Sequence, residues 1–356
     1  MSRVWEVPVH DSTRVRGVRV AVHEASAHAG LGRERTAAAE LVATELAANL
    51  LGHAGGGQLV VNLVGAPDAS GGSGASVQLY ALDHGPGIAD VAAAMRDGRT
   101  TTEGSLGAGL GGCRRIADAF DLFSAPGRGT AAAARIDPAP PASGRGAPPA
   151  PPVGGITLAL ARAEHCGDGW GWARSGDLLT LVLADGLGHG PKAAHASAVA
   201  VAELQRAAHL PPDEVLRVLH TALRPTRGAA VAVAQVDGRR EELHFAGVGN
   251  IGARLRAGDR WTALISHPGV VGAHFPARVP VRRVPWDRDS LLVAHSDGLP
   301  SRWEPPGDPR LLTRDPAVVA AAVLRDAGSP ARPLRDDTSV AVLAPDRRTG
   351  SHDDRL

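Results

Sequence analysis

Acidic residues recur beside apolar stretches in the second half of the chain. Asp185 and Asp297 each follow an apolar run and precede a glycine, Asp168 follows Gly167, and an Asp-Asp pair precedes the last apolar stretch. An acid at the end of a buried strand is costly unless positive charge meets it. One Asp-Gly is typical of a turn, but several acids converging from different strands favour hard cations with oxygen ligands. The candidate ligands are Asp168, Asp185, Asp297, Asp336 and Asp337.

A second group of residues, in the first half, could hold a nucleotide. Glu45 and Asn49 lie one turn apart on a predicted helix face, and Asp83 opens Asp-His-Gly-Pro-Gly after a predicted strand. The glycine-rich segment 107–112 opens another predicted helix, where backbone N–H groups and the helix N-terminus favour phosphate. Thr130 offers a hydroxyl from a returning strand. Each feature alone is typical of a solvated helix face, a turn or a loop, but together they predict a nucleotide pocket.

The chain must divide between these two groups. Residues 137–153 are rich in Pro, Ala and Gly and lack an apolar period, which is typical of an extended linker. We therefore expect a first domain over 1–136, a second over 154–346, and a polar tail over 347–356.

The apolar patterns predict the elements that position the candidate residues. In the first domain they predict a helix over Arg33–Leu51, a hairpin of Leu59–Val64 and Val77–Leu82, and a helix over Gly109–Ala119. The second domain is richer in strands, with helices between them, which indicates sheets covered by helices. Its predicted strands are Ile156–Ala161, Leu178–Ala184, Ala229–Val236, Leu243–Val248, Ser290–Ala294 and Ser339–Leu343, and its predicted helices are Lys192–Ala208, Asp213–Leu223 and Pro316–Arg325. The expected class is a two-domain α+β protein.

The net charge, the cysteines and the apolar runs limit the partners and the location that we expect for the protein. The 356 residues carry a net charge of +1, which gives no electrostatic reason to expect nucleic acid or an anionic membrane. The two cysteines, Cys113 and Cys166, show no metal-ligand spacing. The N-terminus lacks the apolar core of a signal peptide, and no apolar run approaches the roughly 20 residues that cross a bilayer. We therefore expect a cytoplasmic protein.

The first domain resembles the GHKL ATPase superfamily, and within it the anti-sigma regulatory switch kinases of the RsbT type. The resemblance covers residues 30–136 and rests on the Glu45/Asn49 pair, Asp-x-Gly-Pro-Gly-Ile at 83–88 and Ser-Leu-Gly-Ala-Gly-Leu at 105–110. It implies a Bergerat α/β sandwich that binds ATP with Mg. The implied roles are adenine binding by Asp83, close approach at Gly87, Mg binding by Asn49, phosphate capping by Gly107, Gly109 and Gly111, a place near the base for Thr130, and general base for Glu45.

The second domain resembles the PPM-type phosphatases of the SpoIIE branch, and within it the small RsbX type. Asp-Gly-Leu-Gly-His-Gly at 185–190, the segment 247–251 and Asp-Asp-Thr-Ser at 336–339 carry the resemblance. It implies an αββα sandwich with two Mn or Mg ions, bridged by Asp185 and also bound by the Gly186 carbonyl, Asp168, Asp297, Asp336 and Asp337. The phosphate-binding arginine stays open among Arg162, Arg174 and Arg335. His189 could touch substrate or cap the following helix.

Together the two resemblances imply a bifunctional regulator of partner switching. It would phosphorylate Ser or Thr of STAS-type proteins, such as anti-anti-sigma or stressosome-like proteins in a sigma-factor pathway, and remove the same phosphate. An alternative is an ATP-dependent binding module of the anti-sigma type fused to an active phosphatase, without kinase turnover. A related alternative keeps only the phosphatase active, with ATP as its regulator.

Overall fold

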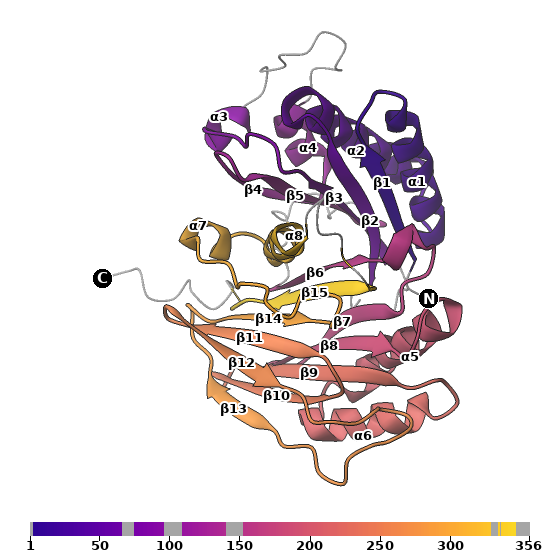
Figure 1. Ribbon diagram of the computed structural model, residues 1–356, viewed down its shortest axis with the longest axis vertical. Coiled ribbons are helices and arrows are strands. Elements are labelled where there is room, and N and C mark those ends of the chain that lie inside the picture. The colour runs from indigo at the N-terminus through magenta and orange to yellow at the C-terminus, as the bar shows by residue number, and fades with distance from the viewer. Residues whose placement is uncertain are drawn as a thin grey trace. The chain divides into compact units, whose positions relative to one another are not determined.

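In the computed structural model, contacts divide the chain into two compact units, each described here by itself (Figure 1). The N-terminal unit comprises Val4–Ala150 and Asp308–Asp326. The C-terminal unit comprises Met1–Arg3, Pro151–Gly307 and Ala327–Leu356. The structure describes residues 3–65, 75–95, 109–139, 152–328, 334 and 336–346. Gly107, Arg335, most of the predicted linker and the predicted tail lie outside these residues.

The N-terminal unit is built on one antiparallel sheet of five strands in the order β1-β2-β3-β5-β4. The hairpin β2–β3 pairs Val61 with Leu79, and β3 continues to β5 by pairing Leu79 with Ala134. The strand bounds are β1 Val4–Val9, β2 Gly57–Gly65, β3 Ala75–Leu82, β4 Ala119–Ala125 and β5 Gly129–Ile136.

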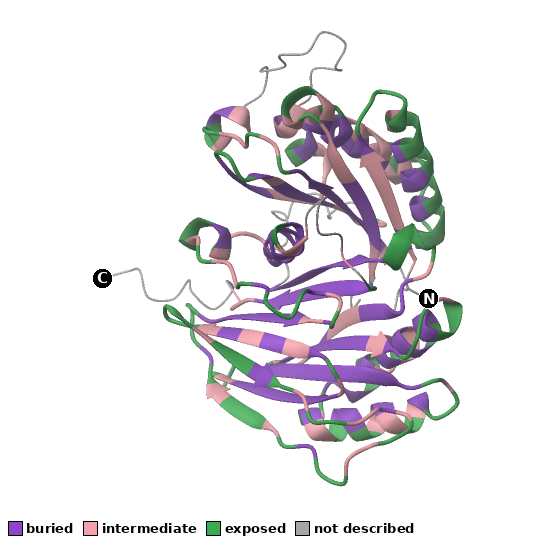
Figure 2. Cartoon of the chain, in the orientation of Figure 1, coloured by how far each residue is buried: buried purple, intermediate pink, exposed green. Residues whose placement is uncertain are grey.

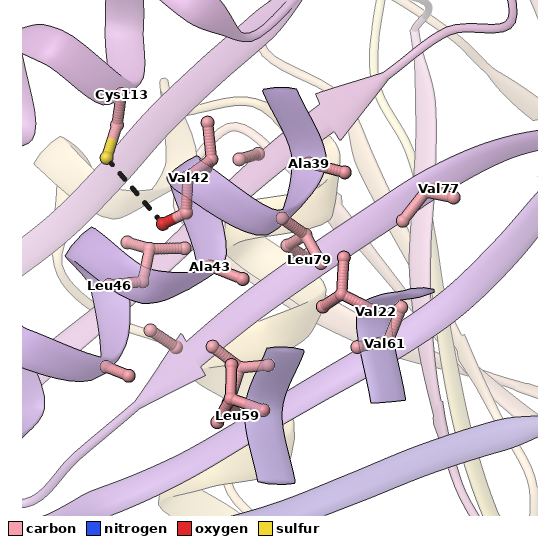
Figure 3. Packing of buried hydrophobic residues seen from close by; sticks show 14 of the residues in the cluster. Val22, Ala39, Val42, Ala43, Leu46, Leu59, Val61, Val77, Leu79 and Cys113 are labelled. Atoms are coloured by element: carbon pink, nitrogen blue, oxygen red, sulfur yellow. Dashed lines mark hydrogen bonds between the residues drawn. The ribbon is translucent and has the colours of Figure 1, made fainter. Parts of the chain in front are cut away.

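Helices pack on one face of this sheet and enclose its core (Figure 3). The long helix α2 ends at Gly55, which takes the left-handed conformation and donates its N–H to the Leu50 carbonyl. Leu46 of α2 meets Leu59 and Leu79 of the sheet in this core, all of them almost completely buried. The helix bounds are α1 Arg14–Ala29, α2 Arg33–Ala54, α3 Val91–Ala94 and α4 Gly109–Ile116.

The segment Asp308–Asp326 also belongs to the N-terminal unit. It contains α7 (Pro309–Leu312) and nearly all of α8 (Pro316–Ala327). The backbone N–H of Asp315 donates to Asp121 of β4 at 2.8 Å, and Arg314 pairs with the same carboxylate at 3.3 Å. In the strand register Asp121 lies beside Ala133 and Tyr80, on the sheet face opposite to Leu79 and Ala134. The segment therefore contacts the face that α1 and α2 do not cover.

The C-terminal unit contains two antiparallel sheets of five strands, ordered β13-β10-β9-β8-β7 and β12-β11-β14-β15-β6. Leu181 and Phe245 of the first sheet share a core with Leu292 and Leu343 of the second, so the sheets pack face to face. The strand bounds are β6 Val153–Leu158, β7 Asp168–Ser175, β8 Leu178–Gly186, β9 Ala229–Asp237, β10 Glu242–Val248, β11 Gly252–Ala257, β12 Arg260–Ile265, β13 Arg282–Pro285, β14 Leu291–His295 and β15 Thr338–Leu343.

Two helices cover the outer face of the first of these sheets. They are α5 (Pro191–Ala207) and α6 (Pro212–Leu223), and each begins with proline, whose missing N–H costs nothing in the first turn. Leu204 and Leu219 pack there against Val231 of β9. In Figure 2 the central strands are buried along their length, whereas the helices alternate between buried and exposed residues.

The predicted two-domain α+β class agrees with this architecture. The prediction for α4 runs too far, because the chain enters β4 at Ala119, and β6 begins and ends earlier than the predicted strand 156–161. Within the described residues no helix is long and apolar enough to cross a membrane.

Candidate functional site

Asp83 organises the predicted nucleotide pocket. It follows β3, it is 6% exposed, and its Oδ1 accepts hydrogen bonds from the N–H groups of Gly85 at 2.9 Å and Thr130 at 3.1 Å. Its own N–H donates to the Thr130 carbonyl at 3.0 Å, so Asp83 and the start of β5 hold each other. Among the described residues no hydrogen bond reaches Oδ2. Asp83 therefore keeps one acceptor oxygen for a ligand.

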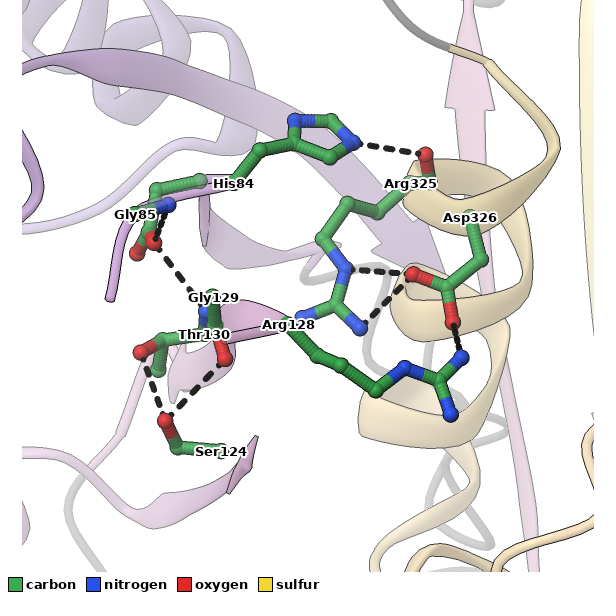
Figure 4. A network of polar contacts seen from close by, with 9 residues as sticks. His84, Gly85, Ser124, Arg128, Gly129, Thr130, Arg325 and Asp326 are labelled. Carbon is green, nitrogen blue, oxygen red and sulfur yellow. Dashed lines mark hydrogen bonds and ion pairs between the residues drawn. The ribbon is translucent and has the colours of Figure 1, made fainter. Parts of the chain in front are cut away.

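A hydroxyl pair supports the same end of the pocket. The side chains of Ser124 and Thr130 lie 3.0 Å apart (Figure 4). Ser124 also accepts the N–H of Ile88 at 2.8 Å. Sequence reasoning found Thr130 and missed Ser124, because this contact depends on the pairing of β4 with β5.

Gly87 is required by the protein's own backbone. Its φ is +73°, and a Cβ at this position would lie 2.1 Å from the Ala125 carbonyl oxygen. The close approach at Gly87 is therefore to the chain itself, and the expected approach of a ligand remains a prediction.

Glu45 and Asn49 of α2 lie beside the start of α4. Glu45 is 4% exposed, and its Oε2 accepts the N–H of Gly109 at 3.1 Å. The Nδ2 atom of Asn49 is buried and has no hydrogen-bond partner among the described residues. A buried N–H donor without an acceptor is costly, and a phosphate oxygen would accept it, whereas the side-chain oxygen of Asn49 is the atom that would ligate Mg. These positions fit an Mg–ATP complex.

Glycines 109 and 111 lie where phosphates are expected. Gly109 takes φ +51°, and nothing lies within 4 Å of a Cβ placed there, whereas Gly111 is buried in the first turns of α4. Cys113, one turn further on, is buried, and burial with the nearby Glu45 charge raises the pKa of its thiol to about 12. It is therefore a core thiol and not a nucleophile.

The acids of the C-terminal unit gather at the ends of paired strands. Asp168 and Asp185 face each other across the β7–β8 ladder. Burial raises the pKa of Asp185 from 3.8 to about 7, and the charges of Asp297, Asp336 and Asp337 add to the rise. Because their charges act on Asp185, Asp297, Asp336 and Asp337 lie near it, and Asp168 pairs with it in the ladder.

Asp168 is the acid whose surroundings fit a cation best. It is completely buried, and neither carboxylate oxygen has a hydrogen-bond partner among the described residues. Burial and the Asp185 charge raise its pKa well above the ordinary value. The hydroxyls of Ser296 and Ser339 oppose the rise, although neither reaches hydrogen-bonding geometry. A buried pair of carboxylates without donors fits a divalent metal ion.

The remaining acids are held by specific contacts. Asn250 donates to Asp297 at 2.5 Å and so helps to position this carboxylate. The two oxygens of Asp337 accept the N–H groups of Leu160 at 2.7 Å and Gly167 at 2.6 Å. Each oxygen keeps a second lone pair, so Asp337 remains available to a metal.

Gly186 lies beside the same acids, because it follows Asp185 in the chain. Its N–H donates to the carbonyl of Gly167, the residue before Asp168, at 3.0 Å. Among the described residues no three His, Cys, Asp or Glu side chains already form a finished metal cage. The donor set, all oxygen, suits Mg or Mn.

Comparisons with known proteins match a different family model to each half of the chain. Residues 9–135 match the histidine kinase-like ATPase domain, and residues 175–346 match stage II sporulation protein E (SpoIIE). The serine/threonine-protein kinase RsbT of Bacillus subtilis (strain 168) is 39% identical over 101 residues, which cover 28% of this chain and 71% of that protein. The chain belongs to the RsbT kinase family. In the same chain a SpoIIE-type phosphatase domain follows the RsbT-like domain, as the sequence predicted.

Two solved structures resemble about half of the chain less closely. One comes from work on the bacterial stressosome, with 28% identity, 53% of this chain and 97% of that chain covered, and a TM-score of 0.47. The other is RsbX in complex with magnesium, with 18% identity, 53% and 92% covered, and a TM-score of 0.42. Both scores are below 0.5, so the assignment rests on the sequence matches. The predicted family, fold class and enzyme class are thereby confirmed, with ATP and divalent metal ions as the implied cofactors.

Proposed function

We propose that the chain is a bifunctional partner-switching regulator that phosphorylates Ser or Thr of STAS-type proteins and removes that phosphate again. One observation carries the proposal: an RsbT-like domain that retains both Glu45 and Asn49 precedes, on one chain, a SpoIIE-type domain with five clustered acids. Joining two opposing activities raises their effective concentration around a shared partner. Anti-anti-sigma or stressosome-like proteins of a sigma-factor pathway are the partners that the RsbT likeness favours.

In the kinase half the protein positions the reacting groups. Asp83 offers its free oxygen to the adenine amino group, and Thr130 lies beside it. Asn49 would hold the Mg ion, which neutralises charge on the phosphates when it is bound. Glu45 uses one oxygen to hold Gly109 and keeps the other for the proton of the acceptor hydroxyl. The phosphates would lie against Gly107, Gly109 and Gly111.

In the phosphatase half the acids would hold two Mn or Mg ions. Two such ions supply a hydroxide at neutral pH and neutralise the phosphoryl group. Asp185 would bridge them, with the Gly186 carbonyl beside it. Asp297 stays oriented through Asn250, and Asp337 fixes the backbone at Gly167, directly before Asp168. The metal ligands would be Asp168, Asp185, Gly186, Asp297, Asp336 and Asp337.

Separate variants test the proposal. Glu45→Ala is expected to abolish phosphate transfer from ATP to a STAS protein and to leave phosphatase activity with Mn intact, whereas Asp185→Asn does the reverse. Loss of both activities in either variant contradicts the assignment of two sites. ATP binding without transfer to any STAS protein supports the alternative, an anti-sigma binding module fused to a phosphatase.

A further inference from the structure

Arg227 lies next to the clustered acids of the SpoIIE-type domain. In the β8–β9 ladder Asp185 pairs with Ala230, and the ladder continues because Leu187 donates its N–H to the Gly228 carbonyl at 3.0 Å. The same register places Arg227 opposite Gly188. Arg227, on the connection from α6 to β9, therefore lies beside the loop that directly follows Asp185.

The guanidinium of Arg227 lies over this loop and is available for a ligand. A Cβ on Gly188 would come within 2.8 Å of the Arg227 Nη1 atom, so the cation rests against the Gly188 backbone. Arg227 is exposed, and among the described residues it has no ion-pair or hydrogen-bond partner. Three residues of strand span about 10 Å, a distance that a phosphate and an arginine side chain can bridge together.

A phosphorylated substrate brings a dianion to this site, and a cation beside the acids would bind phosphate oxygens that the two metal ions do not contact. The fork of a guanidinium matches two phosphate oxygens at once. Two of the other candidates are less suitable, because Arg174 already pairs with Asp346 at 2.8 Å and Arg162 has contacts of its own.

We propose that Arg227 binds the phosphate of the phospho-Ser or phospho-Thr substrate and is a specificity residue of the phosphatase site. The proposal rests on the phosphatase half of the proposed function. It assigns a substrate contact that the acids themselves cannot make.

The test compares Arg227→Ala, Arg227→Lys and the control Arg224→Ala, which removes another exposed arginine from the same connection. With Mn and a phosphopeptide, we expect Arg227→Ala to raise KM and the inhibition constant of inorganic phosphate at least tenfold, with kcat little changed. In Arg227→Lys both constants should lie between those of the wild type and Arg227→Ala, and in Arg224→Ala both should equal those of the wild type. Calorimetry should show unchanged Mn binding.

Equal KM and phosphate inhibition in Arg227→Ala and Arg224→Ala overturn the proposal, as does loss of Mn binding in Arg227→Ala. Equilibrium dialysis of phosphate with the Mn-loaded wild type and Arg227→Ala tests whether Arg227 binds phosphate, even if the protein has no turnover. If the wild type binds phosphate through Arg227 but hydrolyses no phosphoester, the proposed function fails and the assignment of Arg227 stands.

A different observation carries a second inference, about regulation. The SpoIIE match spans residues 175–346, yet Asp308–Asp326 packs within the RsbT-like unit. At its end the Arg325 carbonyl lies 3.2 Å from Nε2 of His84, and Asp326 pairs with Arg128 at 3.0 Å (Figure 4). These contacts are built around a fully buried Arg325 side chain, which pairs with Asp326 at 2.7 Å.

The partners of this segment flank the nucleotide pocket. His84 follows Asp83, and Arg128 precedes Gly129, at which an added Cβ would lie 2.1 Å from the Asp83 carbonyl oxygen. In the other direction, the chain runs from Asp297 into the segment and from the segment to Asp336. The same backbone therefore links the pocket with the loops that carry two of the clustered acids.

We infer that nucleotide at Asp83 regulates the phosphatase through this segment, an inference that rests on both halves of the proposed function. A non-hydrolysable ATP analogue with Mg should change the wild-type rate on a generic phosphoester at least twofold. The double variant His84→Ala/Asp326→Ala should bind the analogue normally, keep the basal rate and lose the change.

The matched control is Arg206→Ala, which removes an exposed ion pair with Glu203 on α5 and should keep the full response. Hydrogen exchange of residues 308–326 should slow on analogue binding in the wild type and not in the double variant. An unchanged wild-type rate and exchange, or an equal response in the double variant, contradicts the inference. A missing basal rate would instead contradict the proposed phosphatase.

Discussion

Replacing Asp185 by asparagine should stabilise the metal-free C-terminal unit at alkaline pH and remove its response to metal. The pKa of Asp185 is raised from 3.8 to about 7, so the folded state binds a proton that the unfolded chain has released between these values. Stability therefore falls as pH rises through this window. Fully developed, the penalty corresponds to about 4 kcal/mol, at about 1.4 kcal/mol for each pH unit.

Asparagine has nearly the shape of the protonated acid and cannot ionise. In EDTA at pH 8 we expect Asp185→Asn to raise the free energy of unfolding by up to about 4 kcal/mol, and at pH 4 by less than about 1 kcal/mol. With Mn the wild type should be more stable than Asp185→Asn, because only the wild type gains the binding energy of the metal.

Urea unfolding followed by tryptophan fluorescence suits this measurement, because Trp5 alone of the six tryptophans lies in the RsbT-like unit. Asp259→Asn is the control, since the Asp259 side chain is fully exposed. A variant that is less stable than the wild type in EDTA at pH 8, or whose gain is the same at pH 4, would refute the reasoning that the acids repel one another in one cluster.

Three further predictions concern the RsbT-like unit. Asp83→Asn should weaken ATP binding at least tenfold in calorimetry, because an NH2 group replaces either the free oxygen or the oxygen that accepts the N–H groups of Gly85 and Thr130, and the basal phosphatase rate should not change. Glu45→Gln should lower phosphate transfer to a STAS protein by about 10²–10⁴-fold with ATP binding retained; transfer at the wild-type rate would exclude Glu45 as the base. Gly87→Ala should destabilise this unit by about 1–3 kcal/mol in thermal unfolding followed by circular dichroism, because its Cβ would lie 2.1 Å from the Ala125 oxygen, whereas Gly65→Ala, with open space around it, should cost less.

The sequence was sufficient wherever a local pattern determines the structure. Helix α2, the hairpin β2–β3 and strands β8 and β9 were predicted within a few residues, because their apolar periods are long and unbroken. The sequence also predicted that Asp168 and Asp185 lie close together, since acids at the ends of neighbouring strands share a sheet edge.

What the sequence could not predict depends on long-range packing. Helix α8 was expected with the second domain because of its place in the chain, yet its end is held by His84 and Arg128. Arg227 carries no motif, and only the register of β8 with β9 brings it opposite Gly188. Strand β1 pairs with β2, which lies far from it in the sequence, and the apolar pattern of β1 is too short to predict a strand.

The most direct test of opposing activities on one chain is a phosphate time course on a single STAS protein. Mass spectrometry would follow its Ser and Thr residues after mixing with Mg–ATP, Mn and either the wild type or Asp185→Asn. The account predicts lasting phosphorylation with Asp185→Asn, and with the wild type a phosphorylation that declines once ATP is exhausted. Absence of phosphate with Asp185→Asn on every STAS protein tried, or equal persistence with both proteins, would contradict it.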